Sequence, residues 1–101
     1  MILNRKECFL EKKPCVYILK CRDGSYYTGW TNDIEKRLAA HNSGTGAKYT
    51  KSRRPAVLVY IEYVPDKSAA LKREAAIKRL SRTRKRNLIE TAALPDHLSL
   101  K

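Results

Sequence analysis

Residues 15–41 constrain the fold of this chain most strongly, because an Asp23-Gly24 pair separates two runs rich in β-branched and aromatic residues. An Asp-Gly pair between such runs is a strong hairpin signal. A helical pattern begins directly after the second run. The segment therefore predicts a β-hairpin over 15–21 and 26–31, followed at once by a helix.

The length of the hairpin loop decides which side chains share a face of the sheet. A two-residue loop pairs Tyr17 with Trp30 and puts Tyr17 and Tyr27 on opposite faces, since side chains alternate along a strand. A three-residue loop that ends with Gly24 in the left-handed conformation pairs Tyr17 with Gly29. Both tyrosines then lie on one face. Turn chemistry allows both loops, and we favour the three-residue loop.

Cap residues frame the first predicted helix. Asn32 is the expected N-cap, with Glu35 at the third helical position as a variant of the capping box. Gly44 suits a left-handed C-cap. Two glycines and a proline within residues 44–55 predict a basic loop without regular structure.

The second half of the chain predicts one strand and two helices. Apolar residues on both parities predict a strand over 56–64. Helices are expected over about 68–80 and 81–91, with serines as caps. The run 15–21 is apolar on both parities except Lys20, as in a central strand that is covered on both faces.

These elements predict an α+β (mixed α/β) domain over residues 14–91. We expect a three-stranded antiparallel sheet flanked by three helices, in the order β-β-α-β-α-α. Residues 1–13 are expected to form a loosely ordered arm, and residues 92–101 a flexible tail.

The charge balance indicates a polyanionic partner. The chain of 101 residues carries 22 Lys and Arg against 10 Asp and Glu, a formal charge of +12. Such a field attracts nucleic acid above all. There is no apolar run long enough to span a bilayer and no basic helix with a strong apolar face. We therefore expect a nucleic-acid partner and no membrane.

The cysteines favour a reducing compartment. Cys8, Cys15 and Cys21 are odd in number and form no CxxC motif. This disfavours a disulfide framework, and the spacing is wrong for zinc. We expect Cys15 and Cys21 to be buried thiols in a cytoplasmic protein.

The hairpin and first helix bring four reactive side chains into adjacent elements. Tyr17 and Tyr27 lie on the hairpin, while Arg37 and His41 are one helical turn apart. Together they can form a site that handles phosphate. Taken singly, each residue also fits an ordinary structural role. The two tyrosines fit sheet aromatics, Arg37 an exposed arginine, and His41 a capping or half-buried histidine.

Glu74 is the most informative acid, because it lies between Ala70 and Ile77 in the apolar stripe of its helix. A buried carboxylate needs a cation, hydrogen-bond donors or a metal ion. The alternative is a carboxylate at the edge of the stripe that pairs with Lys78 or Arg73.

The combined pattern resembles the GIY-YIG nuclease domain, and most closely its small stand-alone bacterial members. It covers roughly residues 14–90 and consists of Val16-Tyr17, Tyr27-Thr28-Gly29, Arg37, His41 and the helical Glu74.

The chain departs from the family pattern at packing positions of the strands. Cys15 and Val16 replace the glycine and isoleucine of the first signature, and Thr28 replaces the isoleucine of the second. Asn87 is a possible match for a late asparagine that supports the site in the family.

The resemblance implies metal-dependent hydrolysis of phosphodiester bonds. Glu74 is then expected to hold one divalent ion, Mg²⁺ or Mn²⁺, which keeps several waters. Arg37 would hold the phosphate. Tyr17 and Tyr27 would jointly orient the phosphate and activate water, and His41 would relay a proton or contact the phosphate.

Other cations and one aromatic residue are expected to bind the nucleic acid, chiefly through backbone phosphates. Tyr49 would stack on a base. The favoured hypothesis is a structure- or backbone-directed endonuclease acting on DNA rather than RNA, in repair or recombination. The alternatives are a non-catalytic DNA- or RNA-binding module and, with little support, a protein adaptor. The expected contacts are Lys48, Tyr49, Lys51, Arg53, Arg54, Arg79 and Arg82.

Overall fold

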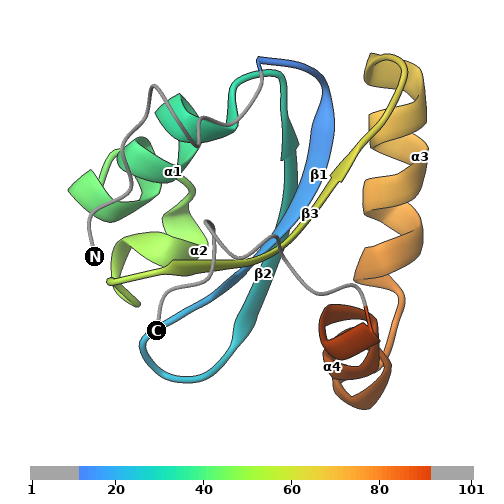
Figure 1. Ribbon diagram of the computed structural model, residues 1–101. Helices are drawn as coiled ribbons and strands as arrows, with labels where there is room; N and C mark the ends of the chain where they lie inside the picture. Colours follow the sequence, from blue (N-terminus) through green and yellow to red (C-terminus); the bar gives the residue numbers. More distant parts are fainter. Residues whose placement is uncertain (1–11, 92–101) are drawn as a thin grey trace.

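A computed structural model describes residues 12–91, in which a three-stranded sheet lies between two groups of helices (Figure 1). The predicted α+β class, antiparallel sheet and element order are confirmed, with one short helix in addition. Nearly all of the expected N-terminal arm and the whole expected tail lie outside the described residues. The elements are β1 (Cys15–Lys20), β2 (Tyr26–Thr31), α1 (Ile34–Ser43), α2 (Lys48–Lys51), β3 (Val57–Tyr63), α3 (Lys67–Lys78) and α4 (Arg82–Thr91).

Strand β1 is the central strand of the sheet. The strand order is β2-β1-β3, and both neighbours run antiparallel to β1. Residues from Cys15 to Leu19 are each at most 1% exposed, whereas Lys20 is exposed. Both the odd- and the even-numbered residues of β1 are apolar because helices cover both faces of this strand.

The hairpin has the three-residue loop. Tyr17 lies opposite Gly29, and Gly24 has the left-handed φ of 86°. A φ of this sign costs glycine no steric strain. The prediction is confirmed, and Tyr17 and Tyr27 consequently lie on one face of the sheet.

Each face of the sheet has its own core. Helices α1 and α2 cover one face, and α3 and α4 cover the other (Figure 1). Tyr17 and the other odd-numbered residues of β1 pack with Ile34 of α1. Val16 and Ile18 pack with Ala70 and Ile77 of α3. Neighbouring residues of one strand thus belong to different cores.

The N-cap of α1 is Asp33, so the prediction of Asn32 is wrong by one residue. The Asp33 carboxylate accepts a hydrogen bond of 3.2 Å from the backbone N–H of Lys36. Glu35 consequently stands at the second helical position and not the third. Asn and Asp are equally good caps, so the pattern cannot choose between neighbours.

The loop over residues 44–55 contains one turn of helix, α2, and the prediction of no regular structure is wrong there. Gly44 ends α1 with a φ of 90°, as expected. Gly44 and Gly46 precede α2 and Pro55 follows it. These residues therefore flank the helical turn without interrupting it.

Helix α3 begins after Asp66, whose carboxylate accepts a 2.8 Å hydrogen bond from the N–H of Ala69. Ser68 is therefore not a cap, contrary to the prediction. Ser81 does cap α4, since its hydroxyl oxygen accepts a 3.2 Å hydrogen bond from the N–H of Arg84.

The described cysteines are buried free thiols, as predicted. Cys15 and Cys21 form no disulfide, and burial raises the pKa of Cys15 to about 11. Cys8 lies outside the described residues. None of the helices in residues 12–91 is long and apolar enough to cross a membrane.

Candidate active site

A fully buried imidazole stands at the centre of the site. His41 Nε2 lies 2.9 Å from the Tyr17 hydroxyl oxygen, and His41 Nδ1 lies 2.7 Å from Thr50 Oγ1. Helix α1 supplies the histidine, β1 the phenol and α2 the threonine. Three elements thus converge on one side chain.

The second phenol completes an aromatic cluster. The Tyr17 and Tyr27 ring centroids are 6.4 Å apart, and the Tyr27 and His41 centroids are 5.1 Å apart with an interplanar angle of 60°. This edge-to-face arrangement is a favourable one for aromatic pairs. The convergence follows from the three-residue hairpin loop, because a two-residue loop would separate the phenols.

Two glycines make room for the reactive groups. A Cβ atom on Gly29 would lie 2.7 Å from the Tyr17 hydroxyl oxygen. A Cβ atom on Gly46 would lie 2.7 Å from the Cα atom of His41. Both separations are below van der Waals contact. The glycine of the Tyr27-Thr28-Gly29 motif therefore has a physical role, which is to admit the phenol from the neighbouring strand.

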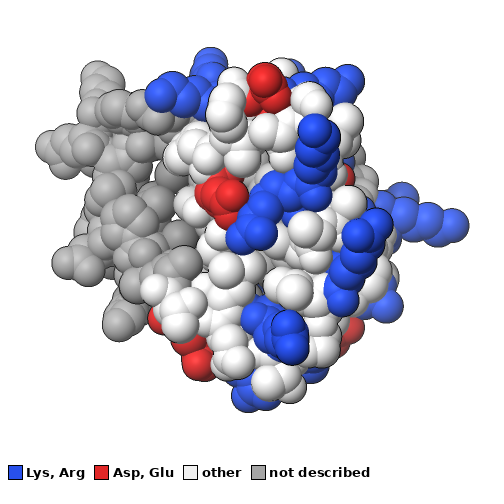
Figure 2. All heavy atoms as spheres, turned by 90° about the vertical axis from the view of Figure 1, so that its right-hand side faces the viewer, with Lys and Arg blue, Asp and Glu red and all other residues white. Residues whose placement is uncertain are grey.

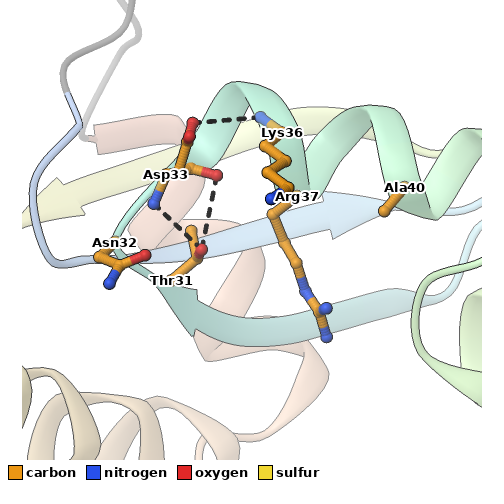
Figure 3. Close-up of a pocket in the computed structure, with 6 residues that line it drawn as sticks. All are labelled: Thr31, Asn32, Asp33, Lys36, Arg37 and Ala40. Carbon is orange, nitrogen blue, oxygen red and sulfur yellow. Dashed lines mark hydrogen bonds between the residues drawn. The ribbon is translucent and has the colours of Figure 1, made fainter.

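Arg37 places a positive charge beside the two phenols. Polar interactions with Tyr17, and less strongly with Tyr27, raise the pKa of its guanidinium. In Figure 3 its side chain extends from α1 toward the sheet. There it borders a depression of about 210 Å³ at the junction of β2 and α1, lined by Thr31, Asn32, Asp33, Lys36, Arg37 and Ala40.

Burial sets the protonation of the site. It raises the pKa of Tyr17 to about 12, although the hydrogen bond with Arg37 opposes the shift. It lowers the pKa of His41, and the nearby Arg37 charge lowers it further. At neutral pH the cluster therefore contains a neutral phenol and a neutral imidazole beside one guanidinium.

Glu74 does not contact this cluster in the described part of the chain. It lies on α3, which covers the opposite face of the sheet (Figure 1). Its side chain is 18% exposed, and its Oε2 lies 3.3 Å from Lys78 Nζ. The predicted pairing with Lys78 is confirmed, while a role for Glu74 as a metal ligand stays a prediction.

The donor set of residues 12–91 is compatible with magnesium. Within residues 12–91 there is no group of three or more His, Cys, Asp or Glu that could hold an ion. Magnesium takes one or two carboxylates and keeps its waters. Glu74 fits this requirement, since only one of its oxygens is paired among the described residues.

The ring of Tyr49 already packs against two partners, although the residue is 38% exposed. It stacks on Tyr27 with centroids 5.9 Å apart, and the Arg53 guanidinium carbon lies 4.1 Å from its centroid. Arg53 also forms a 3.0 Å ion pair with Asp23 of the hairpin loop. Stacking of a base on Tyr49 stays a prediction, and the base would compete with Arg53 and Tyr27 for the ring.

Two further arginines that are predicted to bind nucleic acid already donate hydrogen bonds to backbone carbonyls. Arg54 donates a 3.0 Å hydrogen bond to the Lys51 carbonyl, and Arg82 donates a 2.9 Å hydrogen bond to the Gly24 carbonyl. Arg82 also lies over the Tyr26 ring at 4.8 Å. Their phosphate contacts stay predictions, because these guanidinium groups already have partners.

The remaining predicted residues are exposed. Lys48, Lys51 and Arg79 make no side-chain hydrogen bond or ion pair within residues 12–91, so they are free to meet phosphate there. Asn87 lies exposed on α4, on the far side of the sheet from the phenols. Its supporting role stays a prediction.

Sequence reasoning missed Thr50 and Gly46. Thr50 is fully buried although it belongs to a short basic helix. No periodic pattern marks it, because its partner His41 lies on another helix. The available signal was the pair Gly44 and Gly46. Glycines at this spacing occur both where the backbone passes close to another group and where a loop is flexible, so the pattern alone does not distinguish them.

Comparison with protein families defines the class to which this fold and site belong. The family model described as the GIY-YIG catalytic domain matches residues 13–87. The match covers well over half of the chain, and so the chain belongs to the GIY-YIG family. The resemblance predicted from the sequence is confirmed. Membership indicates a nuclease superfamily and a nucleic-acid substrate.

Individual relatives are small bacterial proteins named UPF0213. A UPF0213 protein of Syntrophus aciditrophicus is 61% identical over 79 residues, covering 77% of this chain and 91% of that protein. UPF0213 protein SH2523 of Staphylococcus haemolyticus is 56% identical over 78 residues, covering 77% and 95%. These names state no activity.

Two solution NMR structures have the same fold. Protein EF2693 of E. faecalis is 44% identical with a TM-score of 0.57, covering 90% of this chain and 94% of that one. UPF0213 protein BH0048 of Bacillus halodurans is also 44% identical, with a TM-score of 0.54, covering 83% and 89%.

Proposed function

We propose that this chain is a metal-dependent endonuclease that hydrolyses phosphodiester bonds in DNA, guided by backbone structure more than by base sequence. The observation that carries the proposal is the convergence of Tyr17, Tyr27, Arg37 and His41 in one cluster. Cytoplasmic action fits its buried free thiols, which a reducing compartment preserves.

Arg37 is the phosphate-binding group in this mechanism. Its guanidinium borders both the phenols and the depression in Figure 3. A planar guanidinium binds two phosphate oxygens at once. In that position it neutralises the charge that accumulates as the water oxygen attacks phosphorus.

The phenols orient the phosphate and help to activate water. With its pKa raised to about 12, Tyr17 is a poor base by itself. His41 is placed to take the phenolic proton, because its neutral ring lies 2.9 Å from the hydroxyl oxygen. Both pKa shifts oppose this transfer, so it would need a bound cation that lowers the pKa of Tyr17. Tyr27 lies beside both rings and shares the task of orientation.

Glu74 is the residue proposed to hold Mg²⁺ or Mn²⁺. When bound there, such an ion would polarise a phosphate that reaches it and would stabilise the leaving oxygen. Helix α3 packs against the edge strand β2, and its Lys78 partner is a flexible, half-exposed side chain. The ion and its waters would meet Glu74 Oε1, which is unpaired within residues 12–91, or Glu74 would exchange Lys78 for them.

Binding to DNA would come from cations around the site. Figure 2 shows Lys and Arg side chains spread over the side of the molecule that carries α3. Exposed Lys48, Lys51 and Arg79 add to this field, within a formal charge of +12. Contacts of this kind hold the phosphate backbone and carry little sequence information.

A second candidate is a nucleic-acid-binding module, for DNA or RNA, whose site is idle. The observation that favours it is the Glu74–Lys78 ion pair on the face opposite the phenols. In that case the cations bind phosphate and the cluster serves only packing.

Cleavage of branched and single-stranded DNA, with RNA in parallel, tests the proposal. We expect nicking with Mg²⁺ or Mn²⁺ that EDTA abolishes. Glu74→Gln and Arg37→Gln should each lower the rate by about 100-fold or more and largely spare retention on DNA. Glu90→Gln removes the same charge from exposed α4 and should nick like wild type.

Equal trace cleavage by wild type and Glu74→Gln, with every substrate and metal, would favour the binding module over the enzyme. Metal-dependent cleavage of RNA and not of DNA would support the proposed chemistry but would change the proposed substrate from DNA to RNA.

A further inference from the structure

The Thr50 hydroxyl contacts two groups of different hydrogen-bonding character. Thr50 Oγ1 lies 3.0 Å from the Ala47 carbonyl oxygen and 2.7 Å from His41 Nδ1. A carbonyl oxygen only accepts, so the single hydroxyl proton can point to Ala47. Thr50 Oγ1 is then left as an acceptor, and His41 Nδ1 must carry the proton between them.

The other end of the imidazole requires the same tautomer. Tyr17 is 1% exposed, and its hydroxyl needs an acceptor. Arg37 interacts with this phenol but can only donate. The acceptor at hand is His41 Nε2, 2.9 Å away, and it accepts only when it carries no proton. Hydrogen bonds therefore run in one direction, from Tyr17 to His41, to Thr50 and to Ala47.

Backbone packing keeps these groups in place. Gly46 passes so close to His41 that a Cβ atom would lie 2.8 Å from Nδ1. Thr50 itself is fully buried on α2. The 2.7 Å contact therefore joins two side chains that are both held by their surroundings, and water does not compete for either.

We propose that Thr50 is a positioning residue, which keeps the His41 proton on Nδ1 and thereby leaves Nε2 free to accept the Tyr17 proton. In the transfer the Tyr17 O–H bond breaks and a His41 Nε2–H bond forms, while Nδ1–H stays bonded to Thr50. The resulting phenolate can then take a proton from the attacking water. This catalytic consequence rests on the proposed nuclease function, whereas the tautomer does not.

NMR of the ¹⁵N-labelled protein at neutral pH tests the tautomer without any substrate. Long-range ¹H–¹⁵N spectra distinguish a protonated ring nitrogen from an unprotonated one. The other histidine of the chain is His97, and a His97→Gln background removes its signals. We expect a protonated Nδ1 and an unprotonated Nε2 for His41. A protonated Nε2 in the folded protein would overturn the proposal.

Variants of Thr50 test the positioning role. Thr50→Val keeps the shape and removes the hydroxyl, and we expect a mixture of tautomers with nicking about 10–100-fold slower, as when a partner that orients an imidazole is lost. Thr50→Ser keeps the hydroxyl and should restore both the spectrum and most of the rate. Thr45→Val is the matched control, because Thr45 is exposed in the same loop.

The outcomes separate this proposal from the nuclease proposal. If wild type shows the expected tautomer and never nicks any substrate, the nuclease proposal fails and the hydrogen-bond assignment stands. If wild type nicks and Thr50→Val nicks equally fast with an unchanged spectrum, the positioning role fails and the nuclease proposal stands. Should Thr50→Val not fold, the wild-type and Thr50→Ser spectra still decide the tautomer.

Discussion

The two faces of the sheet differ in what they bury. On the α1 and α2 face, β1 places Tyr17 against His41, whose other nitrogen meets Thr50. On the α3 and α4 face, the adjacent Val16 and Ile18 enter an apolar core. Buried polar groups need partners, whereas apolar groups need only close packing. One strand thus supports a reactive cluster on one side and supplies stability on the other.

The largest effect should follow from filling the space beside Tyr17. In Gly29→Ala the new Cβ atom would lie 2.7 Å from the phenolic oxygen, so the phenol must move. We expect nicking to fall by about 100-fold or more, the range of general acid–base contributions, with the fold retained. Single-turnover cleavage and circular dichroism measure the two quantities.

Gly24→Asn is the matched control for this variant. Gly24 has a positive φ, but a Cβ atom added there would meet no other atom within 4 Å, and Asn tolerates this conformation. An equal loss of nicking in both variants would show that hairpin strain, and not displacement of Tyr17, is responsible.

An intermediate effect is expected from the opposite face. Ile77→Ala removes a fully buried side chain and should lower the free energy of unfolding by about 2–5 kcal/mol. Urea denaturation gives this value, and nicking per folded molecule should stay near wild type. Leu71→Ala, on the same helix and 44% exposed, should cost less than about 0.5 kcal/mol. A large loss of nicking in folded Ile77→Ala would show that the two faces are coupled.

The smallest effect concerns the polar exception on the apolar face. Within residues 12–91, Thr28 Oγ1 is the one buried side-chain polar atom without a hydrogen-bond partner, and Thr28 lies opposite Ile18. Thr28→Val should raise the free energy of unfolding by about 1 kcal/mol, since an unsatisfied buried hydroxyl is costly. Thr50→Val makes the same exchange on the other face and should lower the free energy of unfolding, because the Thr50 hydroxyl has hydrogen-bond partners. Destabilisation by both would imply a partner for Thr28 in solution.

Turn chemistry and periodicity predicted the sheet, its central strand and the shared face of Tyr17 and Tyr27. These features depend on local sequence patterns, because the length of the loop that ends at Gly24 sets the pairing of the whole hairpin. The cap of α1 was misplaced because Asn32 and Asp33 are chemically equivalent in that role. Helix α2 was missed because the side-chain contacts that support it, Thr50 with His41 and Tyr49 with Tyr27, are tertiary.

Local sequence patterns also predicted one part of the candidate site, the cluster of two phenols, a guanidinium and an imidazole. Tyr17, Tyr27, Arg37 and His41 lie in adjacent elements, and strand alternation and helical spacing bring them together. Glu74 follows another strand and lies on a helix of the opposite face, where spacing predicted its pairing with Lys78. Its distance from the phenols depends on how α3 packs, which no local pattern encodes.

A chain of side-chain contacts over the hairpin tip links the basic loop to the reactive cluster. Asp23 holds Arg53, Arg53 covers Tyr49, and Tyr49 lies on Tyr27, which in turn borders the imidazole. A polyanion that drew Arg53 away from Asp23 would release the tip and uncover one face of Tyr49. A ligand on the loop would then change the packing around Tyr27, whose ring contacts that of His41.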